Sequence, residues 1–393
     1  MTWQAKTVGE LFRVVNGGTP KTGVLAYWDG PHQWITPAEM GRLDSPHLAE
    51  SRRTLTDEGL RVGAEPVPAG SIILSSRAPI GHLVINDVPM AFNQGCKGLV
   101  PSAGIDTKFA YYFFLANVDL LESLGTGTTF KELSGSKLKA VVCNYPSLAE
   151  QHRIVAILDE AFAGIATAKA AAEKSLENAG DLFDREVATL FEALTTNHPM
   201  RQIGELCDKV TVGYVGAMAS RYVPTGVPFL RSQNIRPFRI DLGGLTHIDQ
   251  EFHAEISKSA LRPGDVAVVR TGYPGTAAVI PENLPDSNCS DLVIVRPGER
   301  LDPHFLTLFF NSDYGKRMVA GKLVGAAQKH FNVTAAKEAL MPMLTRPEQA
   351  EVVKQCHELR SESQRLQSIY TRKLAALDEL RQSLLQQAFS GQL

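Results

Sequence analysis

The chain has 393 residues, of which 44% are hydrophobic and 21% charged, and its formal net charge is −2 at pH 7. This length allows two or three domains, the composition is that of a soluble globular protein, and the charge gives little indication of a nucleic-acid partner. No apolar run approaches the roughly 18 residues of a membrane span. The five cysteines form no CxxC pair, which argues against a zinc site or a disulfide framework and favours a reducing cytoplasm.

Residues 1–146 are predicted to form a mixed α/β domain. The start, MTWQAKTVGELF, lacks the basic and apolar regions of a secretory signal. Short β-rich runs such as SIILSS (71–76) lie between Gly and Pro turns, and KFAYYFFLANVDLLESL (108–124) has a helical pattern. The segment GTTFKELS (127–134) follows as a polar loop led by glycine.

Residues 147–198 are predicted to form one long helix, which begins after Pro146 and ends before Pro199. Apolar residues recur from Ile154 to Leu190 at steps of three and four, which is typical of a coiled-coil seam. The segment carries four basic and nine acidic residues. Because phosphates would repel such a surface, we expect it to face a protein partner rather than DNA.

The rest of the chain repeats this order. Residues 199–346 contain the strand-like run DVAVVR (265–270), the helical pattern HFLTLFFNSDYGKRMVA (304–320) and the loop GAAQKHFN (325–332). Residues 347–393 carry a second seam of similar length. A helix of about 45 residues is roughly 65 Å long at 1.5 Å per residue, which is longer than a globular domain usually needs.

Matched segments lie at offsets of 194 to 198 residues through nearly the whole chain. They include VGEL (8–11) with IGEL (203–206), AGSII (69–73) with PGDVA (263–267), Asn93 with Asn288, and Glu150-Gln151 with Glu348-Gln349. The predicted fold is therefore α+β, with two pseudo-repeated mixed α/β globular domains (1–146 and 199–346). Two long helices (147–198 and 347–393) separate them and pair as an antiparallel coiled coil.

Motifs for the common enzymatic chemistries are missing. The chain has no Gly-rich loop followed by Lys-Ser/Thr, no GxGxxG and no GxSxG. It also lacks the Asn/Asp-Pro-Pro-aromatic tetrapeptide of an amino-methyltransferase, of which Asn144-Tyr145-Pro146-Ser147 is only an echo. Two similar domains on a helical spacer suit a two-part linear target, and DNA half-sites are the natural candidate.

In its first half the chain resembles the specificity (S) subunits of type I restriction-modification systems through NGGTP, YWDGPHQWITPAEM, GTTFKELS and YPSLAEQHRIVAILD. Its second half matches through RSQNI, QKHFN, RPEQAEVV and LLQQAFSGQL. The resemblance implies two target-recognition domains that each read half of a bipartite, asymmetric site in double-stranded DNA. It also implies a non-catalytic chain without a cofactor of its own. Two methyltransferase (M) subunits carrying S-adenosylmethionine are expected to dock on the helices, and restriction (R) subunits to join them.

Candidate DNA-contacting residues are chosen because Arg and Lys suit phosphates and guanine, whereas Asn and Gln suit adenine. In the first domain they are Lys21, Arg77, Asn93, Gln94, Lys97 and Lys131. In the second they are Arg231, Gln233, Asn234, Arg236, Arg270, Lys329 and His330. Each copy keeps a lysine in its Gly-led loop, Lys131 in the first and Lys329 in the second, and both are predicted to clamp the DNA backbone. Trp34 and Phe229 occupy equivalent places and are predicted to be core residues.

Two other function classes stay open at this point. The chain could be an enzyme acting alone, a nuclease or a methyltransferase, which would need motifs that it lacks. It could also be a coiled-coil scaffold for protein assembly that never contacts DNA, or the specificity subunit of a related methyltransferase-based defence complex.

Overall fold

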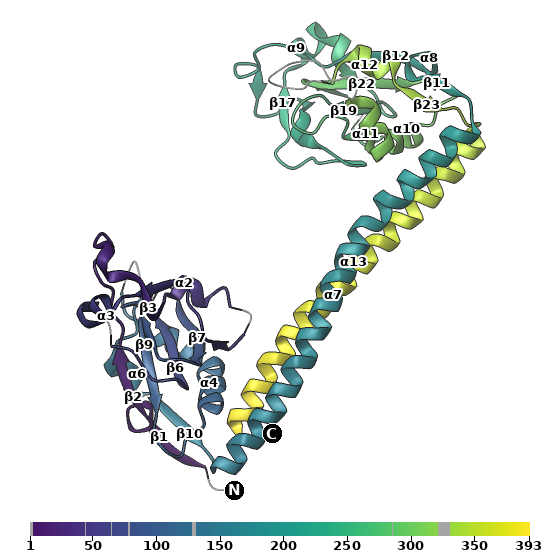
Figure 1. Cartoon of the computed structure of the whole chain (residues 1–393). Coiled ribbons are helices and arrows are strands. Elements are labelled where there is room, and N and C mark those ends of the chain that lie inside the picture. Colours follow the sequence, from purple (N-terminus) through teal and green to yellow (C-terminus); the bar gives the residue numbers. More distant parts are fainter. Residues whose placement is uncertain are drawn as a thin grey trace. The chain divides into compact units, whose positions relative to one another are not determined.

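The computed structural model describes residues 3–43, 45–63, 65–77, 79–127, 131–284, 286–320 and 331–393 (Figure 1). The chain divides into two compact units, and each of them joins a globular part to a stretch of both long helices. Unit 1 comprises residues 1–172 and 372–393, and unit 2 comprises residues 173–371.

The globular part of unit 1 is built on a five-stranded sheet. Its strands, in spatial order, are β2 (Phe12–Asn16), β9 (Cys96–Pro101), β6 (Ser71–Ser76), β7 (Ile80–Asn86) and β4 (His47–Leu48). Every residue of β6, the predicted strand SIILSS, is buried, as expected for a strand covered on both faces. A three-stranded sheet and a strand pair complete the described β-structure: β5 (Arg53–Leu55), β3 (Trp28–Ile35), β8 (Met90–Phe92), and β1 (Gln4–Thr7) with β10 (Val142–Tyr145).

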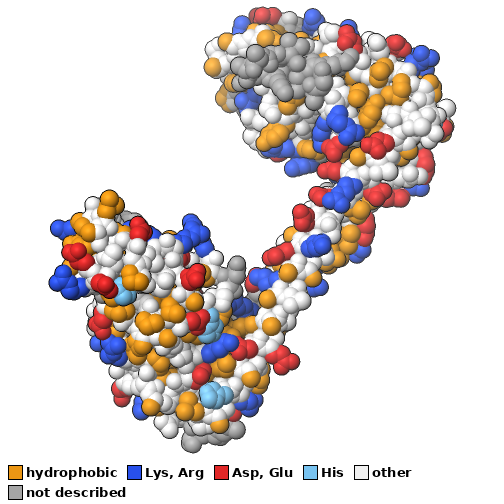
Figure 2. Space-filling model, in the orientation of Figure 1, with side chains coloured by type: hydrophobic (Ala, Val, Ile, Leu, Met, Phe, Trp, Pro, Cys, Tyr) orange, Lys and Arg blue, Asp and Glu red, His pale blue; other side chains and the backbone are white. Residues whose placement is uncertain are grey.

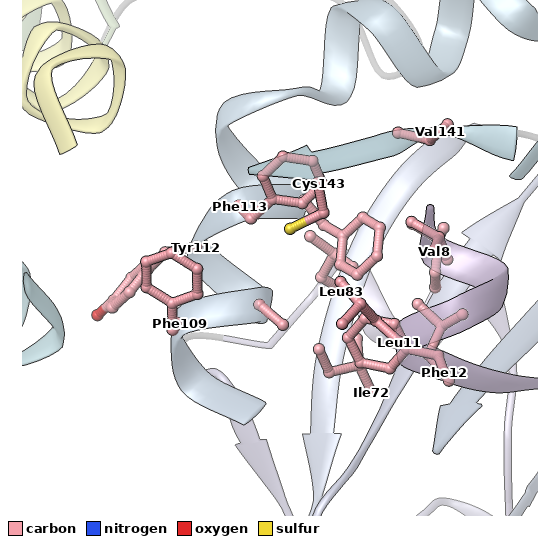
Figure 3. Close-up of a cluster of buried hydrophobic side chains, with 14 of the residues drawn as sticks. Val8, Leu11, Phe12, Ile72, Leu83, Phe109, Tyr112, Phe113, Val141 and Cys143 are labelled. Carbon is pink, nitrogen blue, oxygen red and sulfur yellow. The ribbon is translucent and has the colours of Figure 1, made fainter. Parts of the chain in front are cut away.

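Short helices pack against these sheets and contribute to the core. They are α1 (Val8–Leu11), η1 (Leu25–Tyr27), α2 (Pro37–Met40), α3 (Asp57–Gly63), α4 (Thr107–Ala116), α5 (Val118–Leu124) and α6 (Gly135–Ala140). Figure 3 shows Phe109 and Phe113 of α4 gathered with Leu11, Ile72 and other apolar side chains of the sheet and α1. The segment predicted to be helical (108–124) forms two helices, since it breaks at Asn117, whose Nδ2 donates to the Phe113 carbonyl (2.8 Å) and closes α4.

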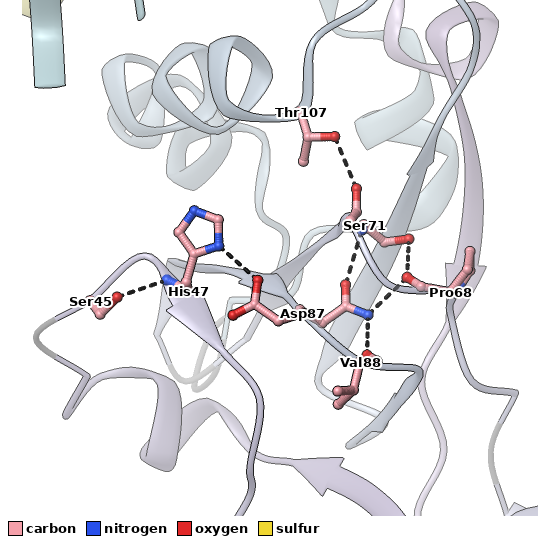
Figure 4. Close-up of polar contacts among 9 residues, drawn as sticks. Ser45, His47, Pro68, Ser71, Asp87, Val88 and Thr107 are labelled. Carbon is pink, nitrogen blue, oxygen red and sulfur yellow. Dashed lines mark hydrogen bonds and ion pairs between the residues drawn. The ribbon is translucent and has the colours of Figure 1, made fainter. Parts of the chain in front are cut away.

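Polar side chains fix the loops at one end of this sheet. The buried Asn86 amide accepts from the Ser71 N–H (3.1 Å) and donates to the carbonyls of Pro68 (2.8 Å) and Val88 (2.7 Å) (Figure 4). Beside it, the imidazole of His47 lies 2.8 Å from the Asp87 carboxylate. The Asn86 bonds satisfy backbone groups where β6 and β7 meet their loops, so they hold the loops against this end of the sheet.

Unit 2 repeats the plan with two main sheets. The first contains β12 (Cys207–Val212), β22 (Leu292–Pro297), β19 (Val266–Val269) and β20 (Ala277–Val279). The second contains β13 (Tyr222–Val223), β17 (Thr246–Ile248), β14 (Val227–Leu230), β21 (Ser287–Cys289) and β18 (Ala260–Leu261). Two strand pairs accompany them: β15 (Ile235–Arg236) with β16 (Arg239–Ile240), and β11 (Met200–Gln202) with β23 (Leu340–Pro342).

The helices of unit 2 also follow those of unit 1. They are α8 (Ile203–Leu206), η2 (Ser232–Asn234), α9 (Gln250–Glu255), η3 (Ser257–Ser259), α10 (Pro303–Asn311), α11 (Asp313–Ala320) and α12 (Val333–Glu338). The second predicted helical segment (304–320) is again two helices. Its break is at Ser312, whose hydroxyl donates to the Phe309 carbonyl (2.6 Å) and accepts from the Gly315 N–H (3.0 Å).

A close contact explains why both copies keep a glycine and a lysine at matched positions, Gly9 with Lys139 and Gly204 with Lys337. A Cβ on Gly9 would lie 3.1 Å from the Cβ of Lys139, and a Cβ on Gly204 would lie 3.1 Å from the Cβ of Lys337. The adjacent backbone bonds also correspond, since the Val8 N–H donates to Val141 (2.8 Å) and the Ile203 N–H to Ala339 (2.9 Å). The repeated glycines therefore allow α1 and α8 to approach the helix that precedes each long helix.

The repeated Glu-Gln pair supplies a buried glutamine to each copy. Gln151 accepts from the Asp106 N–H (2.8 Å) and donates to the carbonyls of Gly104 (3.1 Å) and Pro146 (2.9 Å). Gln349 accepts from the Asp302 N–H (2.7 Å) and donates to Arg300 and Leu344 (both 2.9 Å). Both glutamines are fully buried, so each amide ties the start of a long helix to the N-terminus of α4 or α10.

The match of Asn93 with Asn288 in the sequence repeat is wrong by two residues. The backbone N–H of Asn93 donates to the carbonyl of Ile35 (2.8 Å), and the N–H of Ser290 donates to the equivalent Leu230 (3.1 Å). Ser290, rather than Asn288, is therefore the counterpart of Asn93. The turn after β21 is one residue shorter than the turn after β8, and low identity concealed this difference.

The two long helices are α7 (Leu148–Asn197) and α13 (Arg346–Ser390). In unit 1 the end of α13 lies along the start of α7, where Lys169 pairs with Asp378 (2.7 Å) and Arg153 donates to the carbonyl of Leu393 (2.7 Å). In unit 2 the buried Ser363 hydroxyl donates to the carbonyl of Ala179 (2.7 Å). The predicted antiparallel pairing is therefore confirmed in both units, and small residues allow close approach at the Ala179–Ser363 contact.

A pH dependence follows from the cap of α13. The Glu348 carboxylate accepts from the hydroxyl and the N–H of Thr345 (both 2.7 Å), and these bonds lower the pKa of Glu348 below its ordinary value of 4.5. A lowered folded-state pKa means that the cap stabilises above the ordinary value and that this contribution is lost as the pH falls through the folded value. Glu348→Gln is expected to lower the urea midpoint at pH 7, and the difference should shrink toward zero at acidic pH.

The matched control is Glu358→Gln, since Glu358 is exposed on the same helix and has no hydrogen-bond partner among the described residues. Its midpoint should follow wild type at both pH values. A Glu348→Gln difference that is the same at pH 7 and at acidic pH would contradict this role of the carboxylate.

Candidate nucleic-acid interface

The turn between β8 and β9 carries Asn93 and Gln94. Asn93 is half-buried, its Nδ2 donates to the Thr19 hydroxyl (3.0 Å), and its Oδ1 accepts from the Gly95 N–H (2.8 Å). The side chain of Gln94 is exposed and makes no hydrogen bond to the described residues. Asn93 therefore shapes the turn, whereas Gln94 is free to contact a ligand.

This difference can be measured with a pair of variants. Asn93→Ala removes two hydrogen bonds and is expected to lower the free energy of unfolding by about 1 to 2 kcal/mol. Gln94→Ala changes an exposed side chain and is expected to stay within about 0.5 kcal/mol of wild type. Chemical denaturation of both variants tests this, and equal stability of the two would show that the Asn93 bonds contribute little.

Arg77 lies directly after β6 and packs against the same turn. A Cβ on Gly95 would lie 3.1 Å from both Cγ and Nε of Arg77, so glycine is what lets the arginine lie close to the turn. Nη1 of Arg77 is 3.9 Å from the Glu132 carboxylate, and about a third of the Arg77 side chain is exposed. The guanidinium is thus oriented by its neighbours and keeps donors for another partner.

Lys97 and Lys131 complete the first-domain cluster in different ways. Lys97 belongs to β9, is only 7% exposed, and its ammonium group forms no hydrogen bond or ion pair with the described residues. Burial raises the pKa of Cys96 to about 12, while the charges of Lys97 and Arg77 act to lower it, so both cations lie near this thiol. Lys131 is exposed and precedes Glu132, which forms a β-bridge with Arg77.

Lys21 lies on a neighbouring loop. It is exposed, its carbonyl accepts from Nε1 of Trp28 (3.3 Å), and Thr19 of the same loop bonds to Asn93. The structure therefore gathers Arg77, Asn93, Gln94, Lys97 and Lys131 at one end of β6 and β9, and a hydrogen bond ties the Lys21 loop to them.

In the second domain the candidates Arg231, Gln233, Asn234 and Arg236 form one turn and the start of a hairpin. Asn234 is buried, accepts from the Arg231 N–H (3.0 Å) and donates to the Asp241 carbonyl (3.0 Å), so it holds the turn together. Gln233 is exposed, and Arg236 is exposed 3.7 Å from the Asp241 carboxylate. The guanidinium of Arg231 lies over the ring of Tyr222.

The segment that carries Arg270 is linked to this turn by Asp291. Arg270 follows β19, and its Nε donates to the Phe331 carbonyl (3.2 Å). Its neighbour Thr271 donates to the Asp291 carboxylate (3.3 Å), to which the Ser232 hydroxyl also donates (3.3 Å). Asp291 therefore joins the Arg270 and Arg231 segments. The remaining candidates, Lys329 and His330, lie outside the described residues.

The two copies place different chemistry at the same point of the scaffold. The first-domain turn (93–95) faces the cations Arg77 and Lys97, whereas the second-domain turn (290–291) presents the carboxylate of Asp291. Trp34 and Phe229, which flank these turns in the sheets, are buried as predicted. A shared core thus supports two ends that differ in their polar side chains.

Stacked arginines are candidates that the sequence reasoning missed. The guanidinium of Arg53 lies 3.5 Å from the centroid of the Trp28 ring, and that of Arg221 lies 4.5 Å from the centroid of the Phe252 ring. Both arginines are exposed, so stacking orients their donors toward solvent. Sequence offered little signal, because each ring is many residues from its arginine.

Charges of both signs are mixed on the face of the molecule drawn in Figure 2. Within the described ranges, no group of His, Cys, Asp and Glu is arranged to hold a metal ion. None of the described helices is both long and apolar enough to cross a bilayer.

Comparison with known proteins gives a consistent result. The family described as "Type I restriction modification DNA specificity domain" matches residues 1–178. The MjaIX specificity subunit of Methanocaldococcus jannaschii is 34% identical over 159 residues, which cover 40% of this chain and 37% of that protein. The EcoR124I/EcoR124II specificity subunit of Escherichia coli is 32% identical over 165 residues, which cover 39% and 40%. The chain thus spans less than half the length of these two relatives.

Longer matches have lower identity. The StySPI specificity subunit of Salmonella potsdam is 23% identical over 100% of this chain and 89% of its own length. A chain from a structural study of complex assembly and conformational transition in the type I R-M system superposes with a TM-score of 0.77 at 16% identity, covering 100% and 98% of the two chains. The HsdS subunit from Thermoanaerobacter tengcongensis gives 0.66 at 16% identity, covering 100% and 97%. These two similarities support the fold.

Proposed function

We propose that the chain is a specificity subunit of a type I restriction-modification system and that it reads a bipartite, asymmetric DNA site without catalysing a reaction; the family match over residues 1–178 and the similar specificity subunits support this. Residues 1–146 and 199–346 act as two target-recognition domains, and residues 147–198 and 347–393 act as the helical spacer. Each domain contacts one half of the site, and partner subunits modify or cleave the DNA.

The observation that carries this proposal is the repeat itself. Both copies keep the buried glutamine and the close glycine–lysine contact, yet they differ in their polar side chains where the central strands end. A reader of two unlike half-sites needs this combination: a common scaffold docks similarly on each half-site, and different side chains select different bases.

The geometry divides the candidates into two roles. Exposed Lys21, Lys131 and Arg236 suit phosphate contacts, which fix position along the duplex. Partly or fully exposed Arg77, Gln94 and Gln233 suit base edges in the major groove. The remaining candidates are buried or bonded to the backbone, and they stabilise the turns that carry the exposed candidates: Asn93, Asn234 and Lys97.

The long helices are the proposed docking site for two methyltransferase subunits, which would carry S-adenosylmethionine and methylate adenine; restriction subunits would join this complex. Several leucines of the apolar seam of α13 remain partly exposed in the described chain, and Leu380 is 47% exposed. One partner helix covers only part of such a seam, and additional helices from a partner protein would bury the rest. The net acidic α7 also suits a protein contact better than DNA.

Exchange of one domain tests this proposal. Residues 199–346 are replaced by the corresponding segment of a relative that recognises a different site, and the complex with the methyltransferase is assayed for methylated motifs. We expect one half of the motif to change and the other half to persist, with the reverse result for exchange of residues 1–146. Exchanges that yield a folded complex but leave both halves of the motif unchanged would contradict the assignment.

A further inference from the structure

Unit 2 contains a cavity of about 880 Å³ between its globular part and α13. Apolar side chains form one wall, among them Phe183 of α7, Phe238 of the β15–β16 hairpin and Leu308 of α10. Arg239, His304 and Arg360 line it as well. The volume lies within the range of small-ligand sites, and the lining combines an apolar surface with a few polar groups, as such sites do.

The charges in the cavity are unbalanced. Neither Arg239 nor Arg360 forms an ion pair with a carboxylate of the described residues, although Glu282 also belongs to the lining. Nη2 of Arg360 donates to the Pro237 carbonyl (3.3 Å), and its guanidinium lies 4.4 Å from the centroid of the Phe238 ring. Burial, followed by the nearby charge of Arg239, lowers the pKa of Arg360. Two cations that share an apolar cavity favour an anion between them.

Phe238 is held in an unusual conformation at the cavity wall. Its φ is 66°, in the left-handed region where glycine is preferred, because it occupies the second corner of the tight turn between β15 and β16. The ring packs edge-on against Phe183, with 5.7 Å between centroids. Strained backbone of this kind persists where surrounding contacts hold it, and it occurs often at ligand sites.

The equivalent positions of unit 1 carry side chains that bond and pack with one another. At matching offsets Tyr112 stands where unit 2 has Leu308, and Asp159 and Phe162 stand where unit 2 has His357 and Arg360. Tyr112 bonds to Asp159 and packs against Phe162, and Lys108 forms an ion pair with Asp159 (2.7 Å). Unit 2 has therefore lost both rings and the acid, with Arg360 in place of Phe162 and His304 in place of Lys108. The Thr307 hydroxyl of the same wall is buried without a partner in the described structure.

We propose that this cavity is a binding site for a small organic anion, in which a carboxylate, sulfonate or phosphate group lies between Arg239 and Arg360 and an apolar body packs against Phe183, Phe238 and Leu308. The ligand bridges α13 and the β15–β16 hairpin, so its binding stabilises unit 2. The cavity adjoins the β15–β16 hairpin that also carries Arg236, but its lining includes none of the residues assigned to DNA, and it does not depend on that assignment.

Calorimetric titration of the full-length chain tests both halves of the proposal. Naphthalene-1-sulfonate has the anion and the apolar body, naphthalene-1-methanol lacks the charge, and methanesulfonate lacks the ring. We expect naphthalene-1-sulfonate to bind about tenfold more tightly than either of the others, since the charge-assisted contact with Arg239 and Arg360 is lost with the charge, and the apolar contacts are lost with the ring. It should also raise the melting temperature.

Three variants locate the binding. Leu308→Tyr copies the tyrosine of unit 1 into the cavity and should abolish binding while leaving the chain folded. Arg360→Gln should weaken naphthalene-1-sulfonate about tenfold without affecting naphthalene-1-methanol. Arg201→Gln, which changes an exposed arginine of β11 outside the cavity lining, should bind as wild type does. Equal binding of all three probes, or undiminished binding by folded Leu308→Tyr, would overturn the proposal.

The same titration on the complex with the methyltransferase separates a free ligand from an acidic side chain of the partner. Retained binding of naphthalene-1-sulfonate supports a small-molecule site. Loss of probe binding in the complex, together with weaker assembly of Leu308→Tyr, would assign the cavity to the partner protein and overturn the small-molecule proposal.

Discussion

Replacing Gln349 by Leu is expected to lower the free energy of unfolding of unit 2 by about 3 to 5 kcal/mol, because each buried polar group left without a partner costs about 1 to 3 kcal/mol. The substitution removes three hydrogen bonds, to the Asp302 N–H and to the carbonyls of Arg300 and Leu344. All three lie where α13 meets the start of α10, and leucine satisfies none of them. Denaturant unfolding followed by amide exchange measures the size and the place of the loss.

The repeat supplies a second test of this prediction. Gln151→Leu removes the corresponding three bonds, and its loss of protection should appear in unit 1 rather than unit 2. Gln386→Leu, which changes an exposed glutamine of α13, should leave both units near wild type. If Gln349→Leu were as stable as Gln386→Leu, the glutamine would not be the tie that holds helix and globular part together.

Arg77→Ala is expected to weaken DNA binding by about 1 to 3 kcal/mol, or roughly 5- to 150-fold, and to relax selectivity at one position of one half-site. The reason is geometric: Gly95 and Glu132 orient the guanidinium, and it keeps donors for a base edge. Lys131→Ala should instead weaken binding to all sequences alike and reduce the salt dependence, as the loss of a phosphate contact does. Binding of the assembled complex to a panel of single-base site variants at several salt concentrations distinguishes the two.

Arg77→Lys is the conservative control. It keeps the positive charge but loses the fork of donors, so affinity for unrelated DNA should stay near wild type while selectivity at the one position falls. An equal loss on every sequence for Arg77→Ala would remove its role in base readout.

The architecture was largely predictable because it depends on repeated, local signals. The apolar steps of three and four predicted both long helices, and the prolines at 146, 199 and 347 lie within two residues of their ends. The breaks at Asn117 and Ser312 were not predicted, because hydrophobic periodicity continues across them and only side-chain bonding to the preceding turn separates the helices.

The candidate site was less predictable because burial and partners decide what a polar residue can do. Asn93 and Asn234 have the side chain that suits adenine, yet both have backbone partners. Lys97 is basic but almost fully buried, whereas Arg53 and Arg221 were overlooked although aromatic rings orient them. None of these contacts is visible in spacing, since their partners come from distant parts of the chain.

The most direct test of the central claim is a map of methylated adenines. The methyltransferase partner is expressed, with and without this chain, in a host that lacks adenine methylation. Modified bases are located by long-read sequencing. The account predicts a split, asymmetric motif that appears only when the chain is present. An unchanged methylation pattern, or the same motif without the chain, would show that its paired helices and two polar ends serve another assembly.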